Sequence, residues 1–180
     1  MLPVAPLMIE HRLIERMIKF MDKEVSRIKQ NNAPDTDLID TAIDFIKTYA
    51  DKLHHGKEED ILFRDLAKKS LSSEHKKTMD ELIREHAQGR GNVKRLIEAR
   101  GRYMRGEKAA VKEIVENMEI LVKFYPRHIE KEDKHFFLPV MGYLDEKEKE
   151  GMLKEFYEFD RVFIHAKYKG IVAELEEKKG

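Results

Sequence analysis

The sequence predicts an all-α fold, namely an up-down-up-down four-helix bundle with an additional C-terminal helix. Apolar residues recur at intervals close to 3.6 along the chain, whereas the alternation typical of strands is missing. Charged residues make up 39% of the 180 residues, with only 9 Gly and 5 Pro, which favours long exposed helix faces. Short connections between long helices favour a bundle. We therefore expect one domain, residues 1–180, with the bundle at about 7–142 and the extra helix at about 145–178.

The first two helices follow from an apolar stripe and the sequence that ends it. The first stripe runs from Leu7 to Ile28, and the sequence NNAPD then breaks the helix. The second helix starts near Thr36, continues to Leu66 and ends near SLSSE. Because the connection between them is short, the two helices are expected to lie side by side.

The third and fourth helices are predicted in the same way. The third carries apolar residues from Met79 to Leu96 and stops at RGRYMRG. The fourth carries the stripe from Ile114 to Phe137 and reaches Pro139. Pro126 lies inside the fourth helix, where it is expected to kink the helix or to open its hydrogen-bond ladder locally.

The fifth helix has a clear start signal. Asp145 is a candidate N-cap, and Glu148 follows three residues later, as in a capping box. We expect this helix either to lie across the bundle or to mediate formation of a homodimer, with His165 packed beside Phe163 and Ala166.

Composition excludes several classes of function. The 35 basic and 35 acidic residues give no net charge that would attract nucleic acid or an anionic membrane. Zero cysteines exclude disulfides, thiolate metal sites and a cysteine nucleophile. The start, MLPVAPLM, lacks the basic region of a signal peptide, and the sequence has no apolar run of about 20 residues for a membrane span. A cytoplasmic protein without nucleic-acid or membrane partners is expected.

The two halves of the chain repeat one pattern of metal-ligand residue types. A histidine is followed after 43 or 42 residues by a second histidine, and a glutamate follows four residues later. The six residues are His11, His54 and Glu58 in the first half, and His86, His128 and Glu132 in the second. Histidine and glutamate four apart share one helix face. Counted from the helix ends at about 1.5 Å per residue, all six fall in one layer of an antiparallel bundle.

The six residues continue the apolar stripes and are therefore expected to point inward. His55 instead follows Asp51 and Lys47 on the polar face, so we expect His55 to be exposed, like Asp60. Burying four imidazoles and two carboxylates without partners would cost several kcal/mol each, which argues against a purely structural polar layer. Imidazole and carboxylate ligands suit iron, manganese or zinc, and two bridging carboxylates suit a pair of metal ions.

A ferritin-like carboxylate bundle is the nearest alternative metal site. Such bundles use Glu-x-x-His on two helices. Only Glu132 and His135 have that spacing here, and no second copy exists. That alternative is therefore weak.

The quoted residues resemble the hemerythrin-like family, often called the HHE cation-binding domain. The resemblance rests on His11, HHGKEEDILF, EHAQGR and HIEKEDKHFF, over about Glu10 to Leu138. It implies a four-helix bundle holding a non-haem di-iron centre, with two iron ions joined by carboxylates and an oxo or hydroxo bridge; manganese or zinc are alternatives. Carried over, the four histidines are terminal ligands and Glu58 and Glu132 are bridging ligands. The implied small-molecule ligands are oxygen, peroxide or nitric oxide.

The chain departs from oxygen-carrying hemerythrins in two places. They have a second histidine one turn after the histidine of the third helix, where this chain has Arg90. They have an aspartate five residues after the histidine of the fourth helix, where Glu132 stands at four and Asp133 at five. One imidazole fewer predicts a more open and more easily oxidised centre, and argues against reversible oxygen carriage.

Residues near the six ligands are candidates for supporting roles. Glu59 and Asp133 are expected either to orient imidazoles by hydrogen bonds or to be exposed without such a role. Tyr49 and Tyr125 are expected to flank the centre, with core packing as the alternative. His135 is a hydrogen-bond partner of the ligands, an extra ligand or, as we favour, a residue at a helix end.

The sequence supports three classes of function. The first is a di-iron protein that binds or reacts with oxygen, peroxide or nitric oxide, or senses oxygen or iron. The second is a metal-binding module for iron storage or sensing without catalytic turnover. The third, a helical interaction domain, requires that the protein hold no metal. Whether the chain is an enzyme stays open, because the sequence has no acid–base or nucleophile constellation apart from the ligands.

Overall fold

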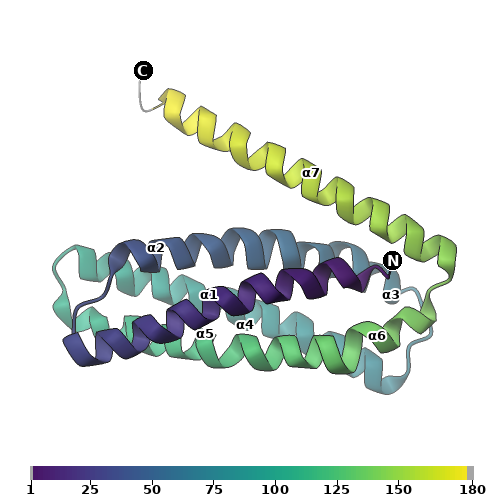
Figure 1. Cartoon of the computed structure of the whole chain (residues 1–180), viewed down its shortest axis with the longest axis horizontal. Coiled ribbons are helices and arrows are strands. Elements are labelled where there is room, and N and C mark those ends of the chain that lie inside the picture. Colours follow the sequence, from purple (N-terminus) through teal and green to yellow (C-terminus); the bar gives the residue numbers. More distant parts are fainter. Residues whose placement is uncertain (1, 178–180) are drawn as a thin grey trace.

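Every regular element among residues 2–177, the part of the chain that the computed structural model describes, is a helix. The side chains of residues 165, 166 and 168–177 lie outside this description, so the expectation for His165 does too. Figure 1 shows long helical segments that lie side by side as a bundle, and a last helix that diverges from it. The predicted all-α class and the helical bundle are confirmed.

The first two long segments differ in their helix type. The first is α1 (Val4–Asn31). The second begins as α2 (Thr36–Phe45), continues as the π-helices η1 (Ile46–His55) and η2 (Glu58–Phe63), and ends in α3 (Arg64–Leu66). A π-helix has hydrogen bonds from residue i to i+5 and often occurs at functional sites.

The remaining segments include one more π-helical turn. The third is α4 (Ser73–Met104), followed by the short 3₁₀-helix η3 (Lys108–Ala110). The fourth comprises α5 (Val111–Lys131), the π-helix η4 (Glu132–Phe136) and α6 (Phe137–Val140). After the 3₁₀-helix η5 (Met141–Tyr143), the last helix is α7 (Glu146–Glu177). α5 continues through Pro126 without interruption.

The helix ends are stabilised by local hydrogen bonds at residues that the sequence marks. Asn32 ends α1 in the left-handed conformation, with φ of 50°, and its N–H donates to the carbonyl of Ile28. Asn tolerates this conformation better than most residues. At the start of α4, Ser72 accepts a hydrogen bond from the N–H of His75 at 3.1 Å. The predicted starts and stops of these helices therefore have a local physical cause.

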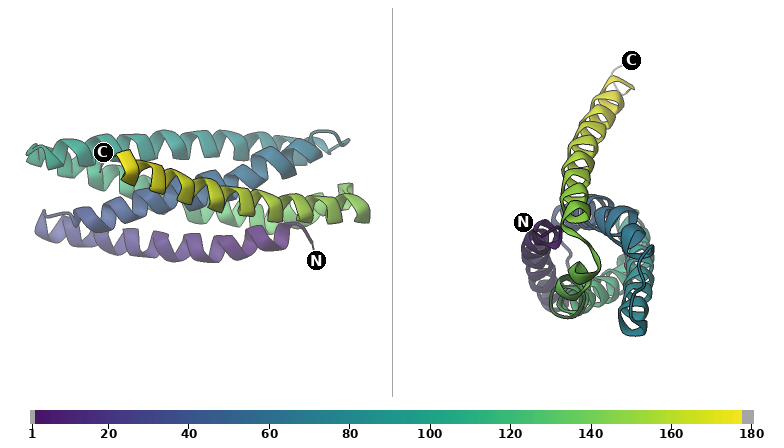
Figure 2. Two further views of the ribbon diagram at one scale, coloured as in Figure 1. Left: turned by 90° about the horizontal axis from the view of Figure 1, so that it is seen from above. Right: turned by 90° about the vertical axis from the view of Figure 1, so that its right-hand side faces the viewer.

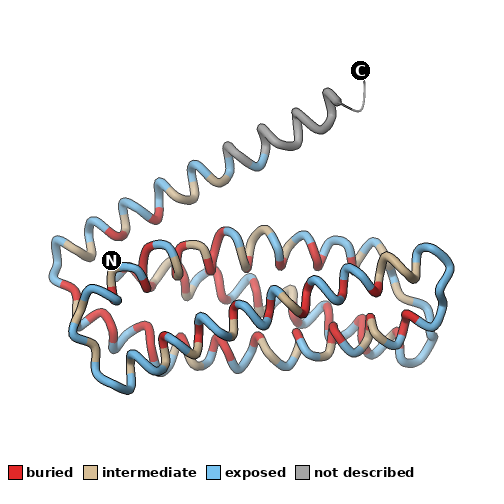
Figure 3. The backbone as a smooth tube through the Cα atoms, turned by 180° about the vertical axis from the view of Figure 1, so that it is seen from behind, coloured by how far each residue is buried: buried red, intermediate tan, exposed pale blue. Residues whose placement is uncertain are grey.

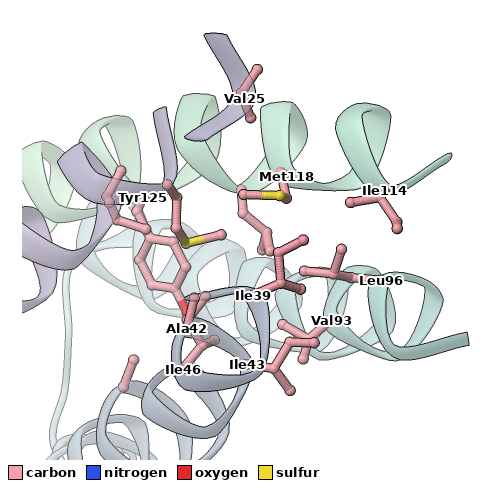
Figure 4. Packing of buried hydrophobic residues seen from close by; sticks show 14 of the residues in the cluster. Val25, Ile39, Ala42, Ile43, Ile46, Val93, Leu96, Ile114, Met118 and Tyr125 are labelled. Carbon is pink, nitrogen blue, oxygen red and sulfur yellow. The ribbon is translucent and has the colours of Figure 1, made fainter. Parts of the chain in front are cut away.

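Buried apolar side chains form two clusters along the bundle axis. One cluster includes Ile39, Val93 and Met118, which pack against one another between the helices (Figure 4). The other includes Leu82 and Phe136. Full burial of each large apolar side chain contributes about 1.5–3 kcal/mol. Figure 3 shows the buried positions along the inward faces of the bundle helices. The two clusters supply the stability that a polar layer between them requires.

The buried contacts of α7 with the bundle lie in its first half, and farther along Lys167 Nζ is 3.9 Å from Asp44 Oδ2. Met152 and Phe156 are buried in the second cluster, whereas Tyr157 and Val162 are exposed. The end-on view in Figure 2 shows α7 rising away from the ring of bundle helices. None of the helices in the described part of the chain combines the length and the apolar character that crossing a membrane requires.

We expect the capping box at the start of α7 to contribute measurably to stability. The N–H of Glu148 donates to Asp145 Oδ1 at 2.8 Å, and the N–H of Asp145 donates to Glu148 Oε2 at 2.9 Å. Asp145→Ala should lower the free energy of unfolding by about 1 kcal/mol, because it leaves a helix N–H unsatisfied. Chemical denaturation measures the effect, and Lys147→Ala, at an exposed position of the same turn, is the control. Equal stabilities of the two variants would contradict this account.

Candidate metal centre

A layer of buried polar side chains separates the two apolar clusters. The layer contains five imidazoles and two carboxylates, each at most 3% exposed: His11, His54, His55, Glu58, His86, His128 and Glu132. The six residues that the repeat predicts as metal ligands therefore lie together in the interior. The side chains divide into two groups, each of which could hold a metal ion.

The first group consists of His11, His54, Glu58 and Glu132. The Nε2 atoms of His11 and His54 lie 2.9 Å apart. Glu58 Oε1 is 3.2 Å from Nε2 of His54, and Glu132 Oε2 is 3.2 Å from Nε2 of His11. Two imidazole nitrogens and two carboxylate oxygens thus converge on one point.

The second group consists of His55, His86 and His128. The Nε2 atoms of His86 and His128 lie 3.1 Å apart. The second oxygen of each carboxylate faces this group, because Glu58 Oε2 is 3.4 Å from Nε2 of His86 and Glu132 Oε1 is 3.3 Å from Nε2 of His128. Glu58 and Glu132 therefore each reach from one group to the other.

The donor atoms of this layer need a cation that the protein itself does not supply. All four carboxylate oxygens of Glu58 and Glu132 are buried without a hydrogen-bond partner, and such groups are costly to leave unpaired. The paired Nε2 atoms would repel each other as lone pairs, because the Nδ1 atoms of these rings already donate to carboxylates. Metal ions at the two groups would satisfy both sets of atoms, so these residues fit a dinuclear centre.

Four of the imidazoles are oriented by a carboxylate on a neighbouring helix. Each Nδ1 donates at 2.7 or 2.8 Å, and the pairs are His54 with Glu10, His86 with Glu59, His128 with Glu85, and His11 with Asp133. Such bonds turn Nε2 of each ring toward the centre and fix its tautomer. The roles predicted for Glu59 and Asp133 agree with these contacts.

Glu10 and Glu85 were not predicted, although the sequence holds a signal for them. Each directly precedes a histidine of the repeat, yet each bonds the histidine of the next helix in the chain. Glu59 and Asp133 likewise directly follow the glutamates of the repeat. Adjacency to a ligand residue in both halves was the usable signal.

Each orienting carboxylate also contacts a cation. Lys57 contacts Glu10, and Arg12 contacts Asp133. Arg90 Nη2 is 2.6 Å from Glu59 Oε1, and Lys131 Nζ is 2.5 Å from Glu85 Oε1. These cations hold the carboxylates in place beside the imidazoles. We call each set of imidazole, carboxylate and cation a relay.

The prediction that His55 is exposed is wrong. His55 is 3% exposed, and its ring stacks on that of His86 with a centroid distance of 3.8 Å. The prediction assumed α-helical spacing, but η1 is a π-helix, whose wider turn places more residues on the inward face. His54 and His55 can therefore both point into the layer. Because Arg90 stands where oxygen-carrying hemerythrins have a histidine, the sequence predicted one imidazole fewer at the centre. This prediction is also wrong, because His55 supplies a fifth imidazole.

The other predicted neighbours differ in their positions. Tyr125 is buried, and burial raises its pKa above the ordinary value. Tyr49 is half-buried; burial and the charges of Glu10 and Asp160 raise its pKa to about 12. His135 is exposed and makes no hydrogen bond to the layer among the described residues, as expected of a residue at a helix end. Asp60 is exposed, as predicted.

One relay extends to α7. The side chain of Lys57 is fully buried, and its Nζ is also 2.8 Å from Oδ1 of Asp160 on α7. Gly56 makes room for this contact, because a Cβ there would lie 2.8 Å from the ring of Phe159. The first half of α7 is thus held directly against the segment that carries His54 and Glu58.

Without metal, the layer is set up to hold protons. Burial lowers the pKa of His11, but the hydrogen bond to Asp133 and the nearby charges of Glu132 and Glu58 raise it overall to about 9. Burial also opposes protonation of His128, yet the charge of Glu132 and the hydrogen bond to Glu85 raise its pKa to about 10. By contrast, burial and the neighbouring His86 and His54 hold the pKa of His55 well below its ordinary value. The neutral His55 is suited to act as a ligand without losing a proton.

Comparison with known proteins identifies one related family. The family model described as hemerythrin HHE cation binding domain matches residues 2–138. The match covers the five imidazoles, both carboxylates and all four relays, and leaves α7 outside. No curated protein and no solved structure matches the chain.

We expect the stability gained from metal to grow with pH. In metal-free protein the pKa values of His11, about 9, and His128, about 10, exceed the value of about 6.5 in an unfolded chain. Protonation therefore stabilises the metal-free fold below pH of about 6.5, and this contribution is lost as pH rises through 9 to 10. Metal binding has the opposite dependence, because protons compete for the same nitrogens.

The measurement is the Tm of metal-loaded and chelator-treated protein across this range. The difference between the two should widen as pH rises. His75→Gln is the control, because His75 bonds Tyr143 outside the layer and its loss should leave the trend intact. A difference that stays constant or shrinks would contradict the assignment of these imidazoles to a metal site.

Proposed function

Because the chain belongs to the hemerythrin HHE cation-binding family, we propose that it is a non-haem di-iron protein. Its centre binds or reacts with oxygen, peroxide or nitric oxide, or uses them or iron itself as a signal. The proposed domain is an up-down-up-down bundle of residues about 7–142 with α7 appended. The observation that carries the proposal is the set of four buried carboxylate oxygens without a protein partner, surrounded by imidazoles.

The proposed ligand set has seven members. His11 and His54 hold the first ion, and His55, His86 and His128 hold the second. Glu58 and Glu132 bridge the two, as their oxygens face both groups. Nitrogen and oxygen donors suit iron, and also manganese or zinc. Bound ferrous ions would supply electrons to a small oxidant.

The protein's own residues control the surroundings of that chemistry. The relays keep Nε2 of four imidazoles turned inward, so the ligand positions are set before metal binds. The apolar clusters on both sides exclude water along the bundle axis. With both bridging carboxylates counted for each ion, the first ion would have four protein donors and the second would have five. We therefore propose that small molecules bind at the first ion, which has fewer protein donors.

Sensing without turnover is the second candidate, and one contact favours it. Asp160 of α7 pairs with Lys57, which contacts Glu10, the partner of His54. A change at the first ion can therefore affect α7 through three successive contacts, from His54 to Glu10, from Glu10 to Lys57 and from Lys57 to Asp160. Steady consumption of peroxide would favour an enzyme, and metal-dependent binding of a partner protein would favour the sensor.

The experiment that tests the proposal is elemental analysis with visible spectroscopy. Natively purified protein is expected to hold two iron ions per chain, with an absorption that dithionite bleaches and oxygen, peroxide or nitric oxide changes. Zinc alone, in a colourless protein, would refute the redox function. A protein that holds no metal would refute the site.

Two histidine variants locate the second ion. His55→Ala is expected to reduce iron content to about one ion per chain, because it removes a ligand from the second group only. His75→Ala is the matched control, since His75 is a half-buried histidine that contacts Tyr143 instead of the layer. Unchanged iron in both variants, as judged on folded protein, would remove His55 from the ligand set.

A glutamate pair tests the relays. Glu81 and Glu85 both contact Lys131, but only Glu85 accepts from His128. Glu85→Ala is expected to weaken metal binding roughly 10- to 100-fold, because the imidazole loses its orienting partner. Glu81→Ala should bind as tightly as the native protein. Competition with a chelator of known affinity measures both, and equal affinities would show that the relay does not tune the centre.

A further inference from the structure

A pocket opens between η1 and α4 and ends at two imidazoles of the second group. Its volume is about 380 Å³, and His55 and His86 line it together with Tyr125 of α5. The same pocket passes Gly89, where α4 has no side chain. It therefore connects the surface of the bundle with the candidate metal centre.

The pocket is larger than an oxygen or nitric oxide molecule needs. Since one water occupies about 30 Å³, 380 Å³ corresponds to roughly a dozen waters, within the size range of small-molecule sites. Its walls include Ile46, Val93 and Ile97. Such walls favour a molecule with an apolar body of several carbon atoms.

The charges at the pocket are not balanced. Arg90 is neutralised, because it donates to Asp51 at 2.7 Å and to Glu59 at 2.6 Å. Lys47 on η1 and Lys94 on α4 also line the pocket, and both are exposed. Within the described part of the chain, neither lysine has a carboxylate within ion-pair distance. Two uncompensated ammonium groups on opposite walls favour an anionic group between them.

The inner end of the pocket is formed by His55, the imidazole of the layer whose Nδ1 lies farthest from a carboxylate oxygen. Nδ1 of His55 lies 3.4 Å from Asp51 Oδ1, whereas the other four imidazoles have carboxylates at 2.7 or 2.8 Å. Asp51 Oδ1 is moreover shared with Arg90. A molecule in the pocket thus contacts the ligand residue that is easiest to displace.

We propose that this pocket is a binding site for a small carboxylate with an apolar body. The carboxylate lies between Lys47 and Lys94, and the body extends along Ile46 and Val93 to the ring of His55. Contact with the metal centre at this inner end rests on the proposed function; binding itself needs no metal.

The test of binding uses octanoate as the probe and titration calorimetry as the measurement. Zinc-loaded protein is expected to bind one octanoate, and acetate much more weakly, because acetate lacks the apolar body. The double variant K47Q/K94Q should lose roughly tenfold in affinity. K19Q/K76Q is the control, since both of its lysines are exposed and lie away from the pocket. Ile97→Glu should also abolish binding, because it adds a negative charge to a partly exposed wall.

The test of the inner end uses cobalt-loaded protein. Octanoate should shift the visible cobalt absorption with the same affinity that calorimetry gives. If octanoate does not bind, or if K47Q/K94Q leaves its affinity unchanged, the proposal that the pocket binds a carboxylate is refuted. If octanoate binds without a spectral shift, in protein that holds two cobalt ions, the proposed contact between octanoate and the metal centre is refuted. If the protein holds no cobalt, the proposed metal site is refuted. Calorimetry on the same protein still shows whether octanoate binds in the pocket.

Discussion

The centre depends on the hydrogen bond between each imidazole Nδ1 and a carboxylate from another helix. This bond determines which ring nitrogen is free to bind a metal ion and which way it points. It is charge-assisted, because a lysine or arginine neutralises each carboxylate from its other side. Since the partners lie on different helices, the same bonds also fix how neighbouring helices align. The same hydrogen bonds therefore determine both how the two apolar clusters pack and how the imidazoles are oriented.

The fold and six of the seven layer residues could be predicted because they follow local periodicity. The stripes, the Asn32 and Ser72 helix ends and the capping box at Asp145 depend on near neighbours in sequence. The layer itself followed from counting residues from the helix ends, which needs only the rise per residue. The internal repeat added a check, because each half predicts the ligands of the other.

The residues that sequence reasoning missed depend on contacts between helices or on helix type. Glu10 and Glu85 stand beside ligand histidines but bond those of the next helix, so only the packed bundle pairs them correctly. His55 was placed on the wrong face because an α-helical period was applied to a π-helix. Nothing local in the sequence marks the wider turn. A cavity such as the one between Lys47 and Lys94 likewise exists only in three dimensions.

The attachment of α7 has a mechanical consequence. The helix is held at Phe156 and Asp160 beside the centre, and it continues to Glu177, roughly 25 Å farther at about 1.5 Å per residue. Beyond Asp160 the described side chains add one more contact, the ion pair of Lys167 with Asp44, so the far part of the helix works as a lever. A tilt of about 10° at the Lys57 contact would move its far end by roughly 4 Å. A displacement too small to alter the packing around the ligands would thus become a movement of the end of α7 large enough to change its binding to another molecule.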